Sequence, residues 1–179
     1  MDPTQQIEEW FYSYGDDVYN FLIYYTGSKD VEDYVQEVFL RAFKSFSTYE
    51  ERANPKTWLF TIARNLVVDK SRRKKLLKFF SFDLLPLKSN PIDFSSPEET
   101  ILKDEMLFEI HNTIHTLKQT YKDVLLSRLI LELSVEETAT ILGWSPSKVN
   151  LTFHRALKAL QKKLVINESE AKVHERTQS

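Results

Sequence analysis

Near its C-terminal end the chain reads Ser134-Val135-Glu136-Glu137-Thr138-Ala139-Thr140-Ile141-Leu142-Gly143-Trp144-Ser145-Pro146. Ser134 and Glu137 have the spacing of a capping box, so they predict the start of a short helix. Gly143 predicts a turn, and Ser145-Pro146 predicts a second helix with proline at its first position. Two short helices joined by a glycine turn form a helix-turn-helix, which places its second helix in the major groove of DNA.

The composition excludes several classes of protein. The chain has 179 residues, no cysteine and a net charge of -2. Without cysteine it has no disulfide framework and no thiolate metal site, which suits a reducing cytoplasm. No apolar run approaches the length of a membrane span, and the acidic N-terminus lacks the basic start of a signal peptide. These features predict a soluble intracellular protein.

Charge is distributed unevenly along the sequence. Residues 1–51 are strongly acidic, whereas residues 52–78 are strongly basic and hold a single acid, Asp69. A protein that only coats DNA is expected to be basic throughout. The pattern instead predicts basic segments for phosphate beside an acidic segment that meets a different macromolecule.

The spacing of apolar residues predicts an all-α chain with two small helical domains joined by a flexible linker. The first helix is expected to end at Gly27, Ser28 is in position to cap the next, and Asn54-Pro55 is a good start for a third. Residues 81–97 are rich in proline and serine without a lasting period, which is typical of a linker. We therefore expect domains over 5–80 and 98–165, and a polar, frayed tail over 166–179.

Three runs of sequence carry a resemblance to a known family. Two of these runs resemble region 2 of bacterial RNA polymerase sigma factors of the extracytoplasmic-function (ECF) group, which is part of the sigma-70 family. The first is Asp33-Tyr34-Val35-Gln36-Glu37-Val38-Phe39-Leu40-Arg41. The second is Thr57-Trp58-Leu59-Phe60-Thr61-Ile62-Ala63-Arg64-Asn65, followed by Asp69 and Arg72-Arg73. The third run resembles region 4 of the same family. It consists of Tyr121-Lys122-Asp123-Val124, the stretch from Ser134 to Gly143, and Val149 to Ala156. The order and spacing of these runs are specific, and they cover nearly the whole chain.

The resemblance implies a sigma factor that binds core RNA polymerase and directs promoter-specific initiation through the -10 and -35 elements. The implied partners are the beta-prime coiled coil and beta flap of the polymerase, promoter DNA, and an anti-sigma factor that can hold this cytoplasmic protein at the membrane. Two alternatives stay open: a stand-alone helix-turn-helix regulator, and an interaction module for polymerase or an antagonist that binds no promoter.

A polymerase-binding face is implied on the second predicted helix. Asp33, Gln36, Glu37 and Arg41 are spaced three to four residues apart, so they can share one side of that helix. The simpler interpretation is a solvated face with an internal Glu37–Arg41 pair. With the resemblance, we favour the docking surface.

The next segment is the predicted reader and melter of the -10 element. A flipped base is trapped by aromatic and polar groups while cations hold the strands. Asn54 is a candidate base contact, but it also suits a helix cap, and Trp58 can be either a melting wedge or part of the core. The -10 candidates are Arg52, Asn54, Lys56, Trp58, Arg64, Asn65, Lys70, Arg72 and Arg73.

The second helix of the helix-turn-helix is the predicted reader of the -35 element. Its N-terminal residues are expected to meet base edges, and its later basic residues are expected to meet phosphate. Family members often carry basic residues where this chain has Asn150 and Thr152, so the family's base preference does not transfer directly. The -35 candidates are Ser147, Lys148, Asn150, Leu151, Thr152, His154, Arg155 and Lys158.

No catalytic, cofactor or metal site is predicted. The sequence has no phosphate loop, no Gly-x-Ser-x-Gly and no His-Glu-x-x-His, so we expect no enzyme activity. His111 and His115 lie one helical turn apart and can bind a metal in principle. As a lone pair, they more simply predict a partly exposed helix face.

Overall fold

The computed structural model describes residues 2–50, 53–80 and 101–177, and over these ranges the chain forms helices and no strand. The prediction of an all-α chain is confirmed for this part of the molecule. The chain divides into two compact units, one built on the helices before residue 81 and one on the helices after residue 100. The predicted linker, 81–97, lies outside the described residues.

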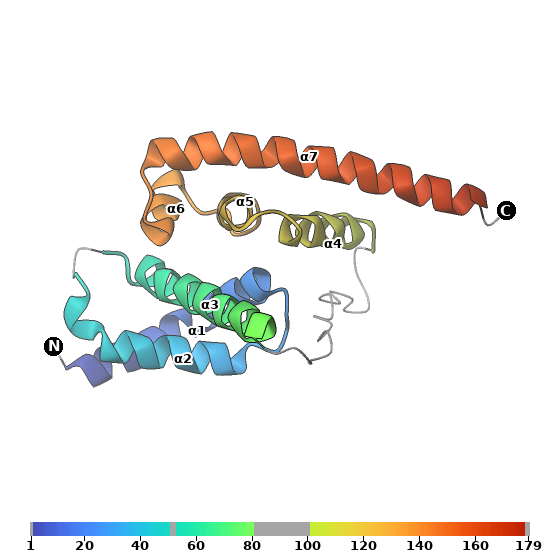
Figure 1. Cartoon of the computed structure of the whole chain (residues 1–179). Helices are drawn as coiled ribbons and strands as arrows, with labels where there is room; N and C mark the ends of the chain where they lie inside the picture. The colour runs from blue at the N-terminus through green and yellow to red at the C-terminus, as the bar shows by residue number, and fades with distance from the viewer. Residues whose placement is uncertain (1, 51–52, 81–100, 178–179) are drawn as a thin grey trace. The chain divides into compact units, whose positions relative to one another are not determined.

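The first unit consists of α1 (Pro3–Thr26), α2 (Glu32–Lys44), a short 3-10 turn (Phe46–Thr48) and α3 (Pro55–Phe80). Helix α1 begins where the Asp2 carboxylate accepts the Thr4 N–H at 3.0 Å, with proline in the first turn. The helix ends at Gly27, which has a φ of 71°. Glycine adopts a positive φ readily because glycine has no Cβ atom. The three α-helices lie side by side and pack pairwise (Figure 1).

Helix α2 begins later than the sequence predicted. The Ser28 hydroxyl accepts the Asp30 N–H at 3.2 Å within the turn, and the N-cap position belongs to Val31, which is fully buried. The prediction that Ser28 caps this helix is therefore wrong. A serine hydroxyl can accept a backbone N–H in a local turn instead of capping a helix, and Ser28 does so here.

Stacked aromatic rings form the centre of the first unit. Phe21 lies 4.6 Å from Tyr25 and 4.4 Å from Phe60, measured between ring centroids, and both pairs are stacked. Phe21 and Tyr25 are fully buried, together with Leu59 and Leu66 of α3. This core fixes α3 against α1, and so fixes the basic residues that α3 carries.

The second unit consists of α4 (Ile101–His115), α5 (Gln119–Leu125), a π-helical turn (Leu126–Ile130), α6 (Val135–Leu142) and α7 (Pro146–Thr177). Helix α7 packs against α4 and α5, and Val149, Ala156 and Leu160 form its buried stripe. This stripe leaves the other sides of the recognition helix available for contacts outside the unit. The helix continues past residue 166, where a frayed tail was expected, because the tail contains good helix formers such as glutamate, alanine and lysine.

The helix-turn-helix is confirmed at the level of individual hydrogen bonds. The Glu137 N–H donates to the Ser134 hydroxyl at 3.1 Å, and the Ser134 N–H donates to the Glu137 carboxylate at 2.8 Å, which is a complete capping box. Gly143 has a φ of 64°, and the Trp144 N–H closes the turn on the Ala139 carbonyl at 2.9 Å. The sequence at 134–146 therefore specifies both helices and the turn between them.

Candidate polymerase and promoter interfaces

The exposed side of α2 carries the predicted polymerase-binding residues. Asp33 and Gln36 are exposed, and Glu37 and Arg41 are half-buried. The opposite side of α2 packs into the core of the first unit through Val38, Phe39 and Ala42, which are buried. The predicted division of this helix into an apolar and a polar side is thus present, with two acids in the first turn, where the helix dipole favours them.

Sequence reasoning missed two large apolar residues on the same exposed side. Leu40 is 51% exposed and Phe43 is 48% exposed. They continue the spacing of Asp33 and Gln36 along α2, so polar and apolar side chains form one stripe, which we call the α2 stripe: Asp33, Gln36, Leu40 and Phe43. The signal was available, because two large apolar residues stand at helical spacing on a face that is otherwise polar.

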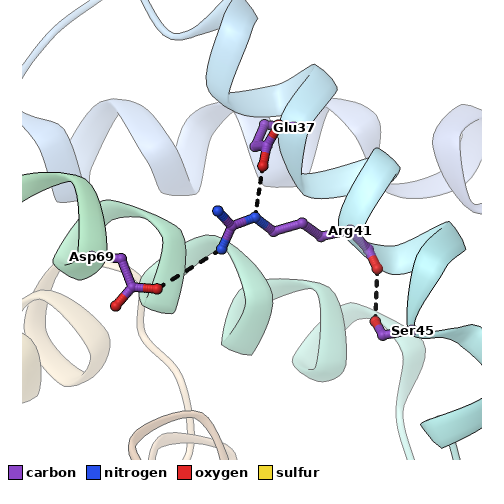
Figure 2. Close-up of polar contacts among 4 residues, drawn as sticks. All are labelled: Glu37, Arg41, Ser45 and Asp69. Atoms are coloured by element: carbon purple, nitrogen blue, oxygen red, sulfur yellow. Dashed lines mark hydrogen bonds and ion pairs between the residues drawn. The ribbon is translucent and has the colours of Figure 1, made fainter.

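Arg41 links α2 to α3 (Figure 2). Its Nε donates to Oε1 of Glu37 at 2.8 Å, and its Nη1 lies 3.9 Å from Oδ2 of Asp69. Its carbonyl accepts the Ser45 hydroxyl at 2.7 Å, which helps to end the helix. The hydrogen bond from Arg41 holds the pKa of Glu37 below its usual value, and the charges of Lys70 and Lys44 act in the same direction.

The start of α3 holds two of the predicted -10 residues in local contacts. Oδ1 of Asn54 accepts the Lys56 N–H at 2.9 Å and the Thr57 N–H at 3.4 Å, so Asn54 is the N-cap. Nζ of Lys56 pairs with Asp17 of α1 at 2.8 Å. Both side chains of this pair remain about 40% exposed, at 38% and 41%. Arg52, the remaining cation predicted in this loop, lies outside the described residues.

Two substitutions of Asn54 separate its role as a helix cap from a contact between its side-chain amide and a base. Replacing Asn54 by Ala should destabilise the first unit by about 1 kcal/mol, whereas Asn54→Asp should keep the cap and the stability. If the amide also meets a base, Asn54→Asp should reduce -10 binding without changing the thermal midpoint measured by circular dichroism. Unchanged DNA binding by the Asp variant would leave the cap as the whole role of Asn54.

Trp58 belongs to a cluster of aromatic rings between α1 and α3. Its ring centroid lies 5.1 Å from that of Tyr49 and 5.9 Å from that of Trp10, and Trp10 in turn contacts Phe46. The Tyr49 hydroxyl donates to the Ala53 carbonyl at 2.5 Å, which ties the loop back to the cluster. Trp10 is buried, whereas Trp58 is half-buried. Trp58 therefore packs in the cluster and still presents part of its ring to the surface.

The rest of α3 presents the other predicted -10 residues. Arg64 is half-buried, and its Nη1 donates to Oδ1 of Asn65 at 3.2 Å. Nζ of Lys70 lies 3.9 Å from the centroid of the Tyr34 ring of α2, a close cation–π contact. The exposed members of the group are Asn65, Lys70, Arg72 and Arg73.

Helix α7 presents the predicted -35 residues on its outer side. The Lys148 N–H donates to the Ser145 hydroxyl at 3.3 Å, which caps the helix, and Nζ of Lys148 lies 4.3 Å from the centroid of the Trp144 ring. Thr152 is half-buried. The exposed members are Ser147, Lys148, Asn150, Leu151, His154, Arg155 and Lys158. All but one of the predicted readers are thus exposed on the helix that the motif assigns to the major groove.

The two histidines of α4 do not form the exposed face that was expected. His111 is only 3% exposed, and its Nε2 lies 3.2 Å from Nε2 of the half-buried His115. Nζ of Lys122 lies 2.9 Å from Nδ1 of His115, so α5 covers the pair with a cation. The prediction of an exposed face is wrong for His111, because helix packing across α4 and α5 cannot be read from a lone pair of histidines. Within the described ranges no group of three or more His, Cys, Asp or Glu residues can hold a metal ion.

Membrane insertion has no candidate segment in the described part of the chain. None of its helices combines the length and the apolar character that a bilayer span requires.

The comparisons with known proteins identify both units. The family model of sigma-70 region 2 matches residues 10–76, and that of sigma-70 region 4 matches residues 107–160. The ECF RNA polymerase sigma factor SigX of Bacillus subtilis is 34% identical, over 90% of this chain and 84% of SigX. The ECF RNA polymerase sigma factor SigW of the same organism is 30% identical, over 84% of each chain.

Two solved structures share the fold. The sigma factor RpoE of Bartonella quintana, in complex with the anti-sigma factor NepR, matches with a TM-score of 0.72 and 21% identity, over 90% of this chain and 98% of RpoE. CnrH, in complex with the cytosolic domain of CnrY, matches with a TM-score of 0.61 and 18% identity, over 91% of this chain and 90% of CnrH. Together with the matched regions and the identity to SigX, the helix-turn-helix and the α2 and α3 motifs place this chain in the ECF group of sigma-70 family RNA polymerase sigma factors.

Proposed function

We propose that this chain binds core RNA polymerase through α2 and directs it to promoters through α3 and α7. The observation that carries the proposal is that three helices expose different kinds of side chain. The α2 stripe combines one carboxylate, one amide and two apolar side chains, whereas the exposed residues of α3 and α7 include most of the candidate DNA contacts. One protein surface is thus suited to an enzyme and two are suited to DNA.

The polymerase-binding surface consists of Asp33, Gln36 and Glu37, extended by Leu40 and Phe43. A docking site combines apolar contact area with polar groups that fix orientation. The carboxylates favour a partner with basic residues. The beta-prime coiled coil is the partner that the family implies for this helix.

The promoter is held at two places. Region 2 uses the aromatic cluster around Trp58 and the cations of α3 to open and hold the -10 element. Region 4 places α7 in the major groove of the -35 element, with the beta flap of the polymerase as its protein partner. Neither element needs to be bound tightly alone, because tethering both units to one polymerase raises the effective concentration of the second contact.

The remaining parts of the proposal concern chemistry, location and control. The chain acts by binding, and the polymerase supplies the catalysis, so the chain is not itself an enzyme. It works in the bacterial cytoplasm. RpoE and CnrH were both solved with a partner bound, NepR described as an anti-sigma factor in the first case and the cytosolic domain of CnrY in the second. This supports an anti-sigma factor as the regulator of this chain as well.

The test of the proposed function is run-off transcription with purified core polymerase on genomic fragments. We expect transcripts from defined start points only when the chain is added. A gel shift with and without core polymerase separates this function from that of a stand-alone regulator. Promoter binding by the free chain as tight as that of the holoenzyme would contradict the proposal.

Base reading by α7 can be measured in the same assay. Replacing Asn150 by Ala should weaken initiation by about five- to hundredfold on the preferred -35 sequence, the effect of losing one good base contact. The loss should shrink when the contacted base pair is changed. Lys148→Ala should behave likewise if Lys148 also meets a base, and Gln161→Ala, an exposed residue further along α7, is the matched control. Equal losses on every template would mean that Asn150 and Lys148 contact only phosphate.

A further inference from the structure

Two side chains of α2 lie against the basic part of α3 rather than on the α2 stripe. Arg41 reaches Asp69, and the ring of Tyr34 lies under the ammonium group of Lys70. Both contacts join α2 to α3, and Tyr34 and Arg41, seven residues apart, lie on the same face of α2. They join the helix proposed to dock on polymerase to the helix proposed to bind the -10 element.

The contact with Asp69 removes the one charge that opposes DNA binding there. Asp69 is the single acid of residues 52–78, and its side chain is 52% exposed. Left unpaired, its carboxylate would repel a phosphate held by Lys70 or Arg73 on the adjacent turns. Nη1 of the Arg41 guanidinium lies 3.9 Å from Oδ2 of Asp69, and Nε of the same guanidinium donates to Glu37 (Figure 2). The contact with Glu37 thus holds the guanidinium beside Asp69. Arg41 thereby keeps the α3 surface cationic.

The contact with Tyr34 holds a cation in place. A free lysine side chain has four rotatable bonds, and ordering it on a phosphate costs conformational entropy. The ammonium of Lys70 lies 3.9 Å from the centroid of the half-buried Tyr34 ring. The ring attracts the ammonium without neutralising it, so Lys70 stays charged and exposed but is already oriented.

We propose that Arg41 and Tyr34 are positioning residues for DNA binding by α3, Arg41 by neutralising Asp69 and Tyr34 by orienting Lys70. The inference rests on the proposed function and deepens it, because it assigns two residues of the docking helix to the DNA-binding helix. It predicts that the effect of these two residues on promoter binding acts through Asp69 and Lys70.

The test compares two affinities for each variant of the full chain. Binding of fluorescently labelled chain to core polymerase measures docking, and binding of the holoenzyme to a promoter fragment from the transcription assay, titrated with salt, measures DNA contact. Arg41→Gln should lower the promoter affinity of the assembled holoenzyme, measured with core polymerase in excess, by about two- to fivefold, the size of one partly exposed charge pair. Asp69→Asn should leave promoter affinity close to that of the wild type, because Arg41 already neutralises this acid.

The double variant Arg41→Gln/Asp69→Asn decides the role of Arg41. It should bind the promoter like Asp69→Asn alone, because Arg41 then has no acid to neutralise. Lys29→Gln removes an exposed positive charge elsewhere in the first unit and should change neither affinity. Equal losses of promoter affinity from Arg41→Gln with and without Asp69 would overturn the inference. If Arg41→Gln alone fails to fold, the double variant still decides, since weaker promoter binding by the double variant than by Asp69→Asn would contradict the proposal.

Tyr34 is tested by pairs of substitutions. Tyr34→Leu should lower promoter affinity by about two- to fivefold, whereas Tyr34→Phe keeps the ring and should bind like the wild type. Lys70→Gln should lower the salt slope by about 1, and should cost less affinity in the Tyr34→Leu background than in the wild type. Additive effects would contradict positioning through Lys70.

A wild-type chain that does not bind core polymerase would contradict the proposed function and this inference together, whereas normal binding with silent variants would contradict the inference alone.

Discussion

Replacing Asp33 and Gln36 together by Ala should lower the affinity of the chain for core RNA polymerase by about thirtyfold or more, the effect of losing a hot-spot contact. Both side chains are exposed on α2 and lie outside the core of the first unit. Their loss therefore removes interface groups while the fold stays intact. The measurement is a titration of labelled chain with core polymerase, with circular dichroism as the check on folding.

The matched control for this variant lies on α1. Ser13 and Asn20 are exposed polar residues of the same unit, and replacing both by Ala should leave core affinity unchanged. Leu40→Ala and Phe43→Ala each test the apolar part of the α2 stripe and should also weaken docking. Full core affinity in the Asp33/Gln36 variant would mean that polymerase binds elsewhere on the chain.

Replacing Phe21 by Ala should destabilise the first unit by about 3–5 kcal/mol. Phe21 is fully buried and stacks on Tyr25 and Phe60, so the substitution removes a ring from the centre of the core and leaves a cavity. The measurement is denaturant unfolding followed by tryptophan fluorescence in a Trp144→Phe background. Trp10 and Trp58 then report on the first unit alone.

Tyr12 provides the control for that measurement, because it lies on the same helix and is 79% exposed. Tyr12→Ala should change the free energy of unfolding by no more than about 0.5 kcal/mol. A loss below about 1 kcal/mol for Phe21→Ala would contradict the stacked core described for α1 and α3.

Local sequence signals predicted the fold where one short stretch decides the structure. The capping box of Ser134 and Glu137 and the turn at Gly143 depend on residues within a few positions of one another, and all are present as predicted. Ser28 was misassigned because the same hydroxyl can cap a helix or close a turn, and here it accepts the Asp30 N–H within the turn before α2.

Contacts between helices could not be predicted in the same way. Nothing in the sequence tells that Lys56 pairs with Asp17, or that Tyr34 lies under Lys70, since each pair joins different helices. His111 was expected on an exposed face for the same reason. The sequence thus predicted which helices carry the candidate residues, whereas the partners of the charged candidates required the packed structure.

The central claim is that the α2 stripe binds core polymerase while α3 and α7 bind promoter DNA. The most direct measurement is association of the purified full chain with purified core polymerase, followed by transcription from a promoter fragment with that complex. We predict a stable complex that starts transcription at a defined site, and a loss of both properties in the Asp33/Gln36 variant. A chain that binds promoter DNA on its own and fails to associate with core polymerase would contradict the account.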